Sequence, residues 1–137
     1  MRLSYCLASA MLFAANPVLA AGSCTGLLAI STTASRQSDA ALVKRDGKQN
    51  VSAAMIGKVL VEGRWRLVWA TPKDAERGIY FFRKSAKSGY HLIDTWGGVL
   101  PPDERADGLD WVTKLKGGGP SPRLAACFVA AAIADGG

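Results

Sequence analysis

Residues 58–96 carry the stretch that decides the fold, KVLVEGRWRLVWATPKDAERGIYFFRKSAKSGYHLIDTW. It contains four short runs rich in β-branched and aromatic residues, separated by turns that hold glycine and charged residues, which is typical of strands. The runs are residues 58–62, 64–70, 79–83 and 90–96. Because the connections are too short for a crossover, these strands are expected to form an antiparallel meander.

Two helices are expected after the sheet. Pro101-Pro102 opens a segment with apolar residues at three-residue spacing as far as Leu115, and Ser121-Pro122 offers an N-cap followed by a proline at the first helical position. Residues 122–134 then show one apolar stripe at helical periodicity. A short helix over 38–44 is a further option. The sequence therefore predicts an α+β fold in which two C-terminal helices cover one face of a four-stranded sheet.

The first 21 residues have the pattern of a secretory signal peptide. Arg2 supplies the positive charge, residues 7–15 form a short apolar run, and small residues up to Ala21 offer a cleavage site. The apolar run is too short to span a bilayer comfortably, so no transmembrane segment is expected. We expect residues 22–137 to form a single small domain that is soluble and periplasmic or secreted.

Cleavage at this site removes Cys6 and leaves two cysteines, Cys24 and Cys127. In an oxidising compartment such a pair is most simply one disulfide. The alternative is a lipoprotein anchored through an acylated Cys24. The residues before Cys24 lack the leucine that lipoprotein signals usually carry three residues ahead of the cysteine, and acylation would leave Cys127 unpaired.

The charges of the chain are segregated. Lys and Arg number 17 against 11 Asp and Glu overall, but residues 58–87 hold eight basic and three acidic side chains, and residues 94–110 hold five acidic and one basic. Such a dipolar domain attracts acidic partners. The candidate partner-binding residues, on a basic face of the sheet, are Arg64, Arg66, Arg83, Lys84 and Lys87. The expected partner is an envelope protein or an anionic envelope component rather than a nucleic acid; the other reading is an ordinary solvated face.

No catalytic residue, metal site or cofactor is expected. His91 is the only histidine, and Asp94, three residues on, lies on the opposite strand face. Outside the cysteine pair only Met55 and His91 remain as copper ligands, which is too few for a tight site. The carboxylates of residues 103–110 fit a solvated helix start. The glycine run 117–119 lacks the Lys-Ser/Thr that completes a phosphate loop, so it predicts a tight turn.

One stretch resembles a known family. The stretch Val-Glu-Gly-Arg-Trp-Arg-Leu-Val-Trp at 61–69, the strand 78–84 that ends in Arg-Lys, and the glycine pair at 97–98 resemble small periplasmic copper uptake system-associated proteins. The Pro-led, Ala-rich segment 122–134 is similar to a later helix of that family. The resemblance covers about 75 residues, and it implies a similar fold and a periplasmic location.

Three functions follow as hypotheses. The favoured one is an exported, non-enzymatic accessory or binding protein that recognises an acidic partner through the basic residues. The second is an inhibitor or immunity protein of an envelope hydrolase, which would use loop 71–78 or loop 97–102. The third is a small hydrolase that uses the carboxylates of residues 103–110.

Overall fold

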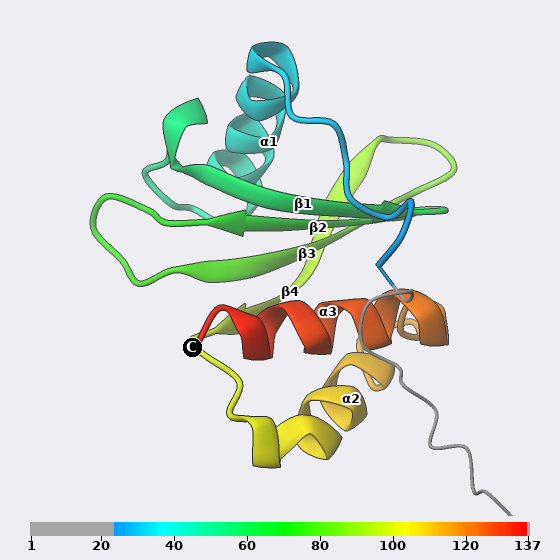
Figure 1. Ribbon diagram of the computed structural model, residues 1–137. Coiled ribbons are helices and arrows are strands. Elements are labelled where there is room, and N and C mark those ends of the chain that lie inside the picture. Colours follow the sequence, from blue (N-terminus) through cyan, green and yellow to red (C-terminus); the bar gives the residue numbers. More distant parts are fainter. Residues whose placement is uncertain (1–23, 137) are drawn as a thin grey trace, which may run out of the picture.

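The computed structural model describes residues 24–136 and has the expected α+β fold (Figure 1). Four strands, β1 (Ile56–Glu62), β2 (Trp65–Ala70), β3 (Gly78–Lys84) and β4 (Tyr90–Gly97), form one sheet in the order β1-β2-β3-β4 with every pair antiparallel. The meander prediction is confirmed, with strand ends within two residues of the predicted ones. The predicted signal peptide, residues 1–21, lies outside the described residues.

The sheet alternates its side chains between two cores, as period-two geometry requires. Trp65, Leu67 and Trp69 of β2 are buried in the first core, together with Phe81 of β3. Val68 of β2 is buried in the second core on the opposite face, with Tyr80 and Phe82 of β3 as neighbours. Both faces of the sheet are therefore covered.

Helices α2 (Arg105–Thr113) and α3 (Pro122–Ala134) cover the face of the first core, as predicted. A short 3₁₀ turn, η2 (Pro102–Glu104), precedes α2. Ser121 caps α3 by accepting a hydrogen bond from the Leu124 N–H, and Pro122 occupies the first turn. Phe128 of α3 packs edge-on against Phe81 at 4.9 Å between ring centroids, so the C-terminal helix is anchored directly on β3.

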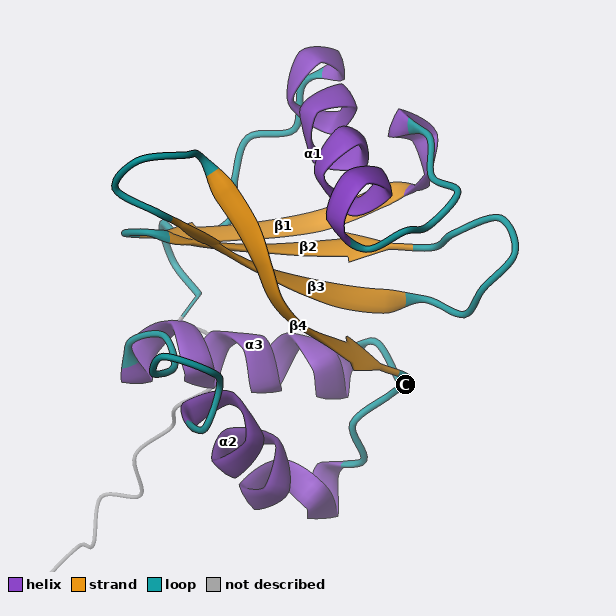
Figure 2. Ribbon diagram, turned by 180° about the vertical axis from the view of Figure 1, so that it is seen from behind, coloured by secondary structure: helices purple, strands orange, loops and turns teal. Residues whose placement is uncertain are grey.

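Helix α1 (Thr33–Asp46) covers the opposite face and is longer than the segment 38–44 (Figure 2). Thr32 and Ser35 form a reciprocal capping box at its start, and Val43 is its fully buried apolar residue. The 3₁₀ turn η1 (Ala53–Met55) links this layer to β1. The strand face that holds Arg66 is thus packed under a helix at this point, rather than left to solvent.

A disulfide between Cys24 and Cys127 ties the start of the described chain to α3, with 5.0 Å between the two Cα atoms. The predicted pairing is confirmed. Residues 27–29 then run along the outer edge of β1, where the Ala29 N–H donates to the Val59 carbonyl and the Val61 N–H donates to the Leu27 carbonyl. Within residues 24–136, no helix is long and apolar enough to cross a membrane.

Candidate functional site

Four of the five candidate basic residues gather at one end of the sheet. Arg64 lies in the β1–β2 turn, Arg83 and Lys84 end β3, and Lys87 lies in the loop between β3 and β4. Antiparallel pairing brings these turns to the same end, where the loop between α2 and α3 also lies (Figure 1). Arg123, in the first turn of α3, adds a fifth cation. We call Arg64, Arg83, Lys84, Lys87 and Arg123 the basic end.

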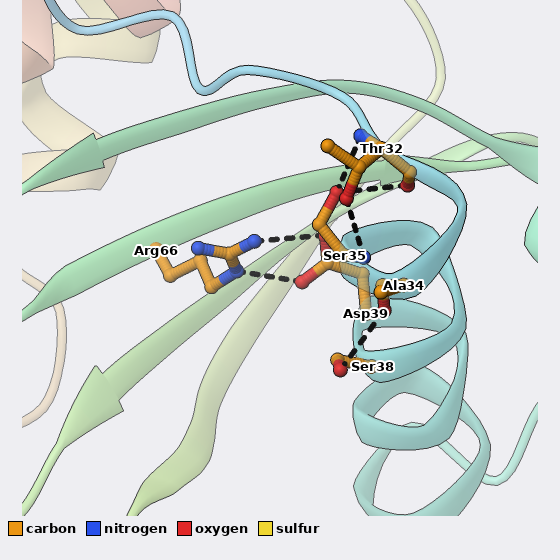
Figure 3. A network of polar contacts seen from close by, with 6 residues as sticks. All are labelled: Thr32, Ala34, Ser35, Ser38, Asp39 and Arg66. Atoms are coloured by element: carbon orange, nitrogen blue, oxygen red, sulfur yellow. Dashed lines mark hydrogen bonds and ion pairs between the residues drawn. The ribbon is translucent and has the colours of Figure 1, made fainter.

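Arg66 does not belong to the basic end, although the sequence grouped it there. Its guanidinium faces α1 and binds the carboxylate of Asp39 at two points, with 2.6 Å between Nε and Oδ1 and 2.9 Å between Nη2 and Oδ2 (Figure 3). Asp39 is only 2% exposed. These hydrogen bonds raise the pKa of Arg66 above its usual value. Its charge is compensated internally, so Arg66 has a structural role.

Arg64 is held in place by the backbone of the neighbouring strand. Its Nε donates to the Lys84 carbonyl at 2.7 Å, and the Lys84 N–H donates to the Arg64 carbonyl at the same distance. Only one edge of the guanidinium is used by these contacts in the described structure. The other N–H groups of Arg64 are left to face solvent or a ligand.

Arg83 is fixed from two sides. Its guanidinium carbon lies 5.2 Å from the centroid of the Trp65 ring, its direct cross-strand partner. Its Nη1 donates to the carbonyls of Gly117 and Gly118 at 3.2 Å each. The glycine run therefore makes a turn, as predicted, and its carbonyls position an arginine. No sequence pattern connected residue 83 with residues 117 and 118.

The two arginines line one cleft of about 540 Å³. Its remaining walls come from the β1–β2 turn, the glycine run and the start of α3. The lining residues are Glu62, Gly63, Arg64, Trp65, Arg83, Gly117, Gly118, Gly119 and Ser121. A concave site with two preoriented guanidinium groups is suited to an oxyanion.

Glu62 is the acidic residue of this cleft, and other side chains already bind it. Ser121 Oγ donates to Glu62 Oε1, and Arg123 Nη1 lies 3.4 Å from Glu62 Oε2. Across residues 24–136, no carboxylate forms an ion pair with Arg64, Arg83, Lys84 or Lys87. The basic end therefore keeps an excess of positive charge that is available to a partner.

The opposite end of the sheet is electrostatically balanced. Asp135, after α3, accepts a hydrogen bond from Trp69 Nε1 at 2.7 Å, and its Oδ1 lies 3.7 Å from Lys58 Nζ. Arg77 Nη2 donates to the Asp135 carbonyl at 3.4 Å. A groove of about 540 Å³ lies there, but its two cations already contact Asp135, Lys58 at the carboxylate and Arg77 at the main-chain carbonyl. No local pattern indicates this role for Asp135, because its partners lie on other elements.

The predicted carboxylate cluster divides between two places. Asp107 and Asp110 of α2 line a cleft of about 280 Å³ with Asp94 of β4, whereas Asp103 lies in η2 and does not line it. Asp110 is paired with Lys114 at 2.8 Å on an exposed helix face. Nowhere in the described chain do three or more metal-ligating side chains converge.

His91 lies on β4 with Nε2 at 2.9 Å from Ser88 Oγ. A serine and a histidine at this distance are a necessary part of a nucleophile–base pair. Ser88 also contacts Ser85 Oγ at 3.0 Å, and both Ser88 and His91 are solvent-exposed. In the described structure no carboxylate hydrogen-bonds the second nitrogen of His91, so the contact lacks the group that orients a catalytic base.

Comparison with known proteins identifies no relative: no family model matches the chain, and no curated protein or solved structure matches it significantly. The resemblance to copper uptake system-associated proteins therefore stays a prediction. The geometry of the site is what supports a function.

Proposed function

We propose that the chain is an exported, non-enzymatic binding protein of the cell envelope that recognises an acidic partner through the basic end. The observation that carries the proposal is the pair of backbone-anchored arginines, Arg64 and Arg83, in one cleft beside Lys84 and Lys87. Arginine and aromatic groups that are already ordered lose little side-chain entropy on binding. The partner is an envelope protein with an acidic face or another anionic envelope component.

Export is supported by the disulfide between Cys24 and Cys127. Disulfides persist in oxidising compartments and are rare in reducing ones. A periplasmic or secreted location is part of the proposal, together with removal of residues 1–21.

Affinity capture from a native envelope extract tests the proposal. The bait is the domain 22–137, either unchanged or with the double substitution Lys84→Glu and Lys87→Glu. A control bait carries Arg36→Glu and Lys73→Glu, which change the net charge equally on exposed residues elsewhere. We expect one stoichiometric partner that resists moderate salt, is retained by the control bait and is lost from the Lys84/Lys87 bait.

Two results would contradict the proposal. One is equal capture by all three baits. The other is loss from both substituted baits at once, since this would mean a general charge effect rather than a localised surface.

A further inference from the structure

We propose that the cleft between Arg64 and Arg83 binds a phosphomonoester group carried by the acidic envelope partner. This inference rests on the proposed function, because it names the chemical group that the basic end recognises.

The free edges of the two guanidinium groups carry the argument. Arg64 uses Nε on the Lys84 carbonyl, and Arg83 uses Nη1 on the glycine carbonyls. In residues 24–136, both Nη atoms of Arg64, and Nε and Nη2 of Arg83, have no hydrogen-bond acceptor. A guanidinium fork with two free donors matches the oxygens of a phosphate group.

The glycine run leaves room for the guanidinium group of Arg83. A Cβ on Gly117 would lie 2.6 Å from Arg83 Nη2, so a side chain there would displace the guanidinium. At Gly118 a Cβ would meet nothing within 4 Å, which leaves the cleft wall open on that side. The backbone of this loop thus allows both the packing of Arg83 and the approach of a ligand.

The charge of the cleft favours a dianion. Glu62 is already bound by Ser121 and Arg123, so it does not neutralise the two arginines. A carboxylate would supply one negative charge, whereas a phosphomonoester carries about −1.5 to −2 near neutral pH and three acceptor oxygens. A cleft of about 540 Å³ is in the range of small-molecule sites and holds more than the phosphate alone.

The partner's phosphomonoester is either a non-lipid phosphate ester, for which glycerol 1-phosphate is the probe, or a lipid headgroup, and the experiment separates the two. Glycerol 1-phosphate is titrated into the domain 22–137 by calorimetry, with succinate as the dicarboxylate comparison. Vesicles of phosphatidylcholine, with and without phosphatidic acid, are tested in parallel by co-sedimentation. Three variants are compared. Arg83→Lys keeps the positive charge but loses the paired N–H donors of the guanidinium group. Gly117→Ala and Arg64→Gln are the other two. Lys73→Gln, at the opposite end, is the matched control.

We expect one-to-one binding that is weakened about tenfold or more by Arg83→Lys and Arg64→Gln, and that stays within about twofold in Lys73→Gln. Binding of glycerol 1-phosphate identifies a soluble ester as sufficient; binding of phosphatidic acid vesicles alone identifies the lipid headgroup. Near-ultraviolet circular dichroism of the tryptophans shows that each variant is folded.

The inference is overturned if the folded domain binds neither probe, if succinate binds as well as glycerol 1-phosphate, or if Arg83→Lys and Gly117→Ala both bind normally. The two proposals fail separately. Capture of a partner that Arg83→Lys retains would leave the binding protein standing without the phosphate site. Phosphate binding without any captured partner would support the phosphate site and contradict the proposed binding protein.

Discussion

Asp39 on α1 and Arg66 on β2 form a two-point ion pair that joins the helix to the sheet, with 2.6 Å between Arg66 Nε and Asp39 Oδ1. Their side chains are 2% and 17% exposed. The pair explains why Arg66 is absent from the basic end. Its charge is neutralised by Asp39, and the contact holds α1 against the sheet.

Replacing Asp39 by Ala is expected to lower the free energy of unfolding by about 3 kcal/mol, because Arg66 would keep a largely buried charge with no partner. Urea unfolding measures the change. The control is Asp110→Ala at the exposed pair with Lys114, where the loss should be below about 1 kcal/mol. Equal losses at the two pairs would mean that Asp39 does not anchor the helix.

The disulfide between Cys24 and Cys127 closes a sequence separation of 103 residues. On the chain-entropy model a loop of this size is worth about 4–5 kcal/mol. The double variant Cys24→Ala/Cys127→Ala should therefore be less stable by several kcal/mol in urea. Intact-mass analysis of the denatured wild-type domain should show a gain of two hydrogen atoms on reduction; an unchanged mass would contradict the bridge.

Gly119 lines the cleft and is also expected to be a structural glycine. A Cβ at this position would lie 2.3 Å from the Val112 carbonyl oxygen and 2.9 Å from Thr113 Cα, and neither backbone atom can move aside cheaply. Gly119→Ala should cost about 1–3 kcal/mol of unfolding free energy. The control is Gly97→Ala, where a Cβ would meet nothing within 4 Å. A Gly119→Ala domain of normal stability in urea would refute the tight contact.

Asp46 should make stability depend on acid pH. The hydrogen bond from Arg45 lowers the pKa of Asp46 below its usual value; burial opposes the shift, and the hydrogen bond from the Leu92 N–H adds to it. A lowered pKa in the folded state means that the stabilisation is complete above the unfolded pKa and is lost as pH falls through the folded one.

The comparison is urea unfolding of wild type and Asp46→Asn at about pH 6 and about pH 3. The difference in unfolding free energy between the two proteins should be larger at the higher pH and should shrink at the lower one. A difference that does not change between the two pH values would contradict the assignment.

The sequence was informative where periodicity and turn chemistry agree. The alternation of Trp65, Leu67 and Trp69 placed β2 correctly, and Ser121-Pro122 gave the start of α3. Helix α1 was only partly anticipated, because its segment is mostly polar. Few apolar residues form its buried side, and Val43 is the most deeply buried of them. Its start depends on the Thr32–Ser35 capping box, in which a serine stands where the usual pattern has Glu or Gln.

The sequence was enough to predict the residue types of the candidate site, but not how they are arranged in space. The excess of basic residues in 58–87 singled out Arg64, Arg83 and their lysine neighbours, and within residues 24–136 no ion pair compensates these four charges. Arg66 could not be separated from them, since its partner Asp39 is 27 residues away in the chain and on another element. The support of Arg83 by Gly117 is a contact across 34 residues, which local patterns do not reveal.

The most direct measurement is a nitrogen-proton correlation spectrum of the domain 22–137 titrated with polyglutamate as an acidic probe. We predict that the amide signals that move belong to the turns of the basic end, residues 62–64 and 83–89, and that those of the opposite loop, residues 71–77, stay in place. Movement centred on residues 71–77, or spread evenly over the surface, would contradict a localised binding site at the basic end.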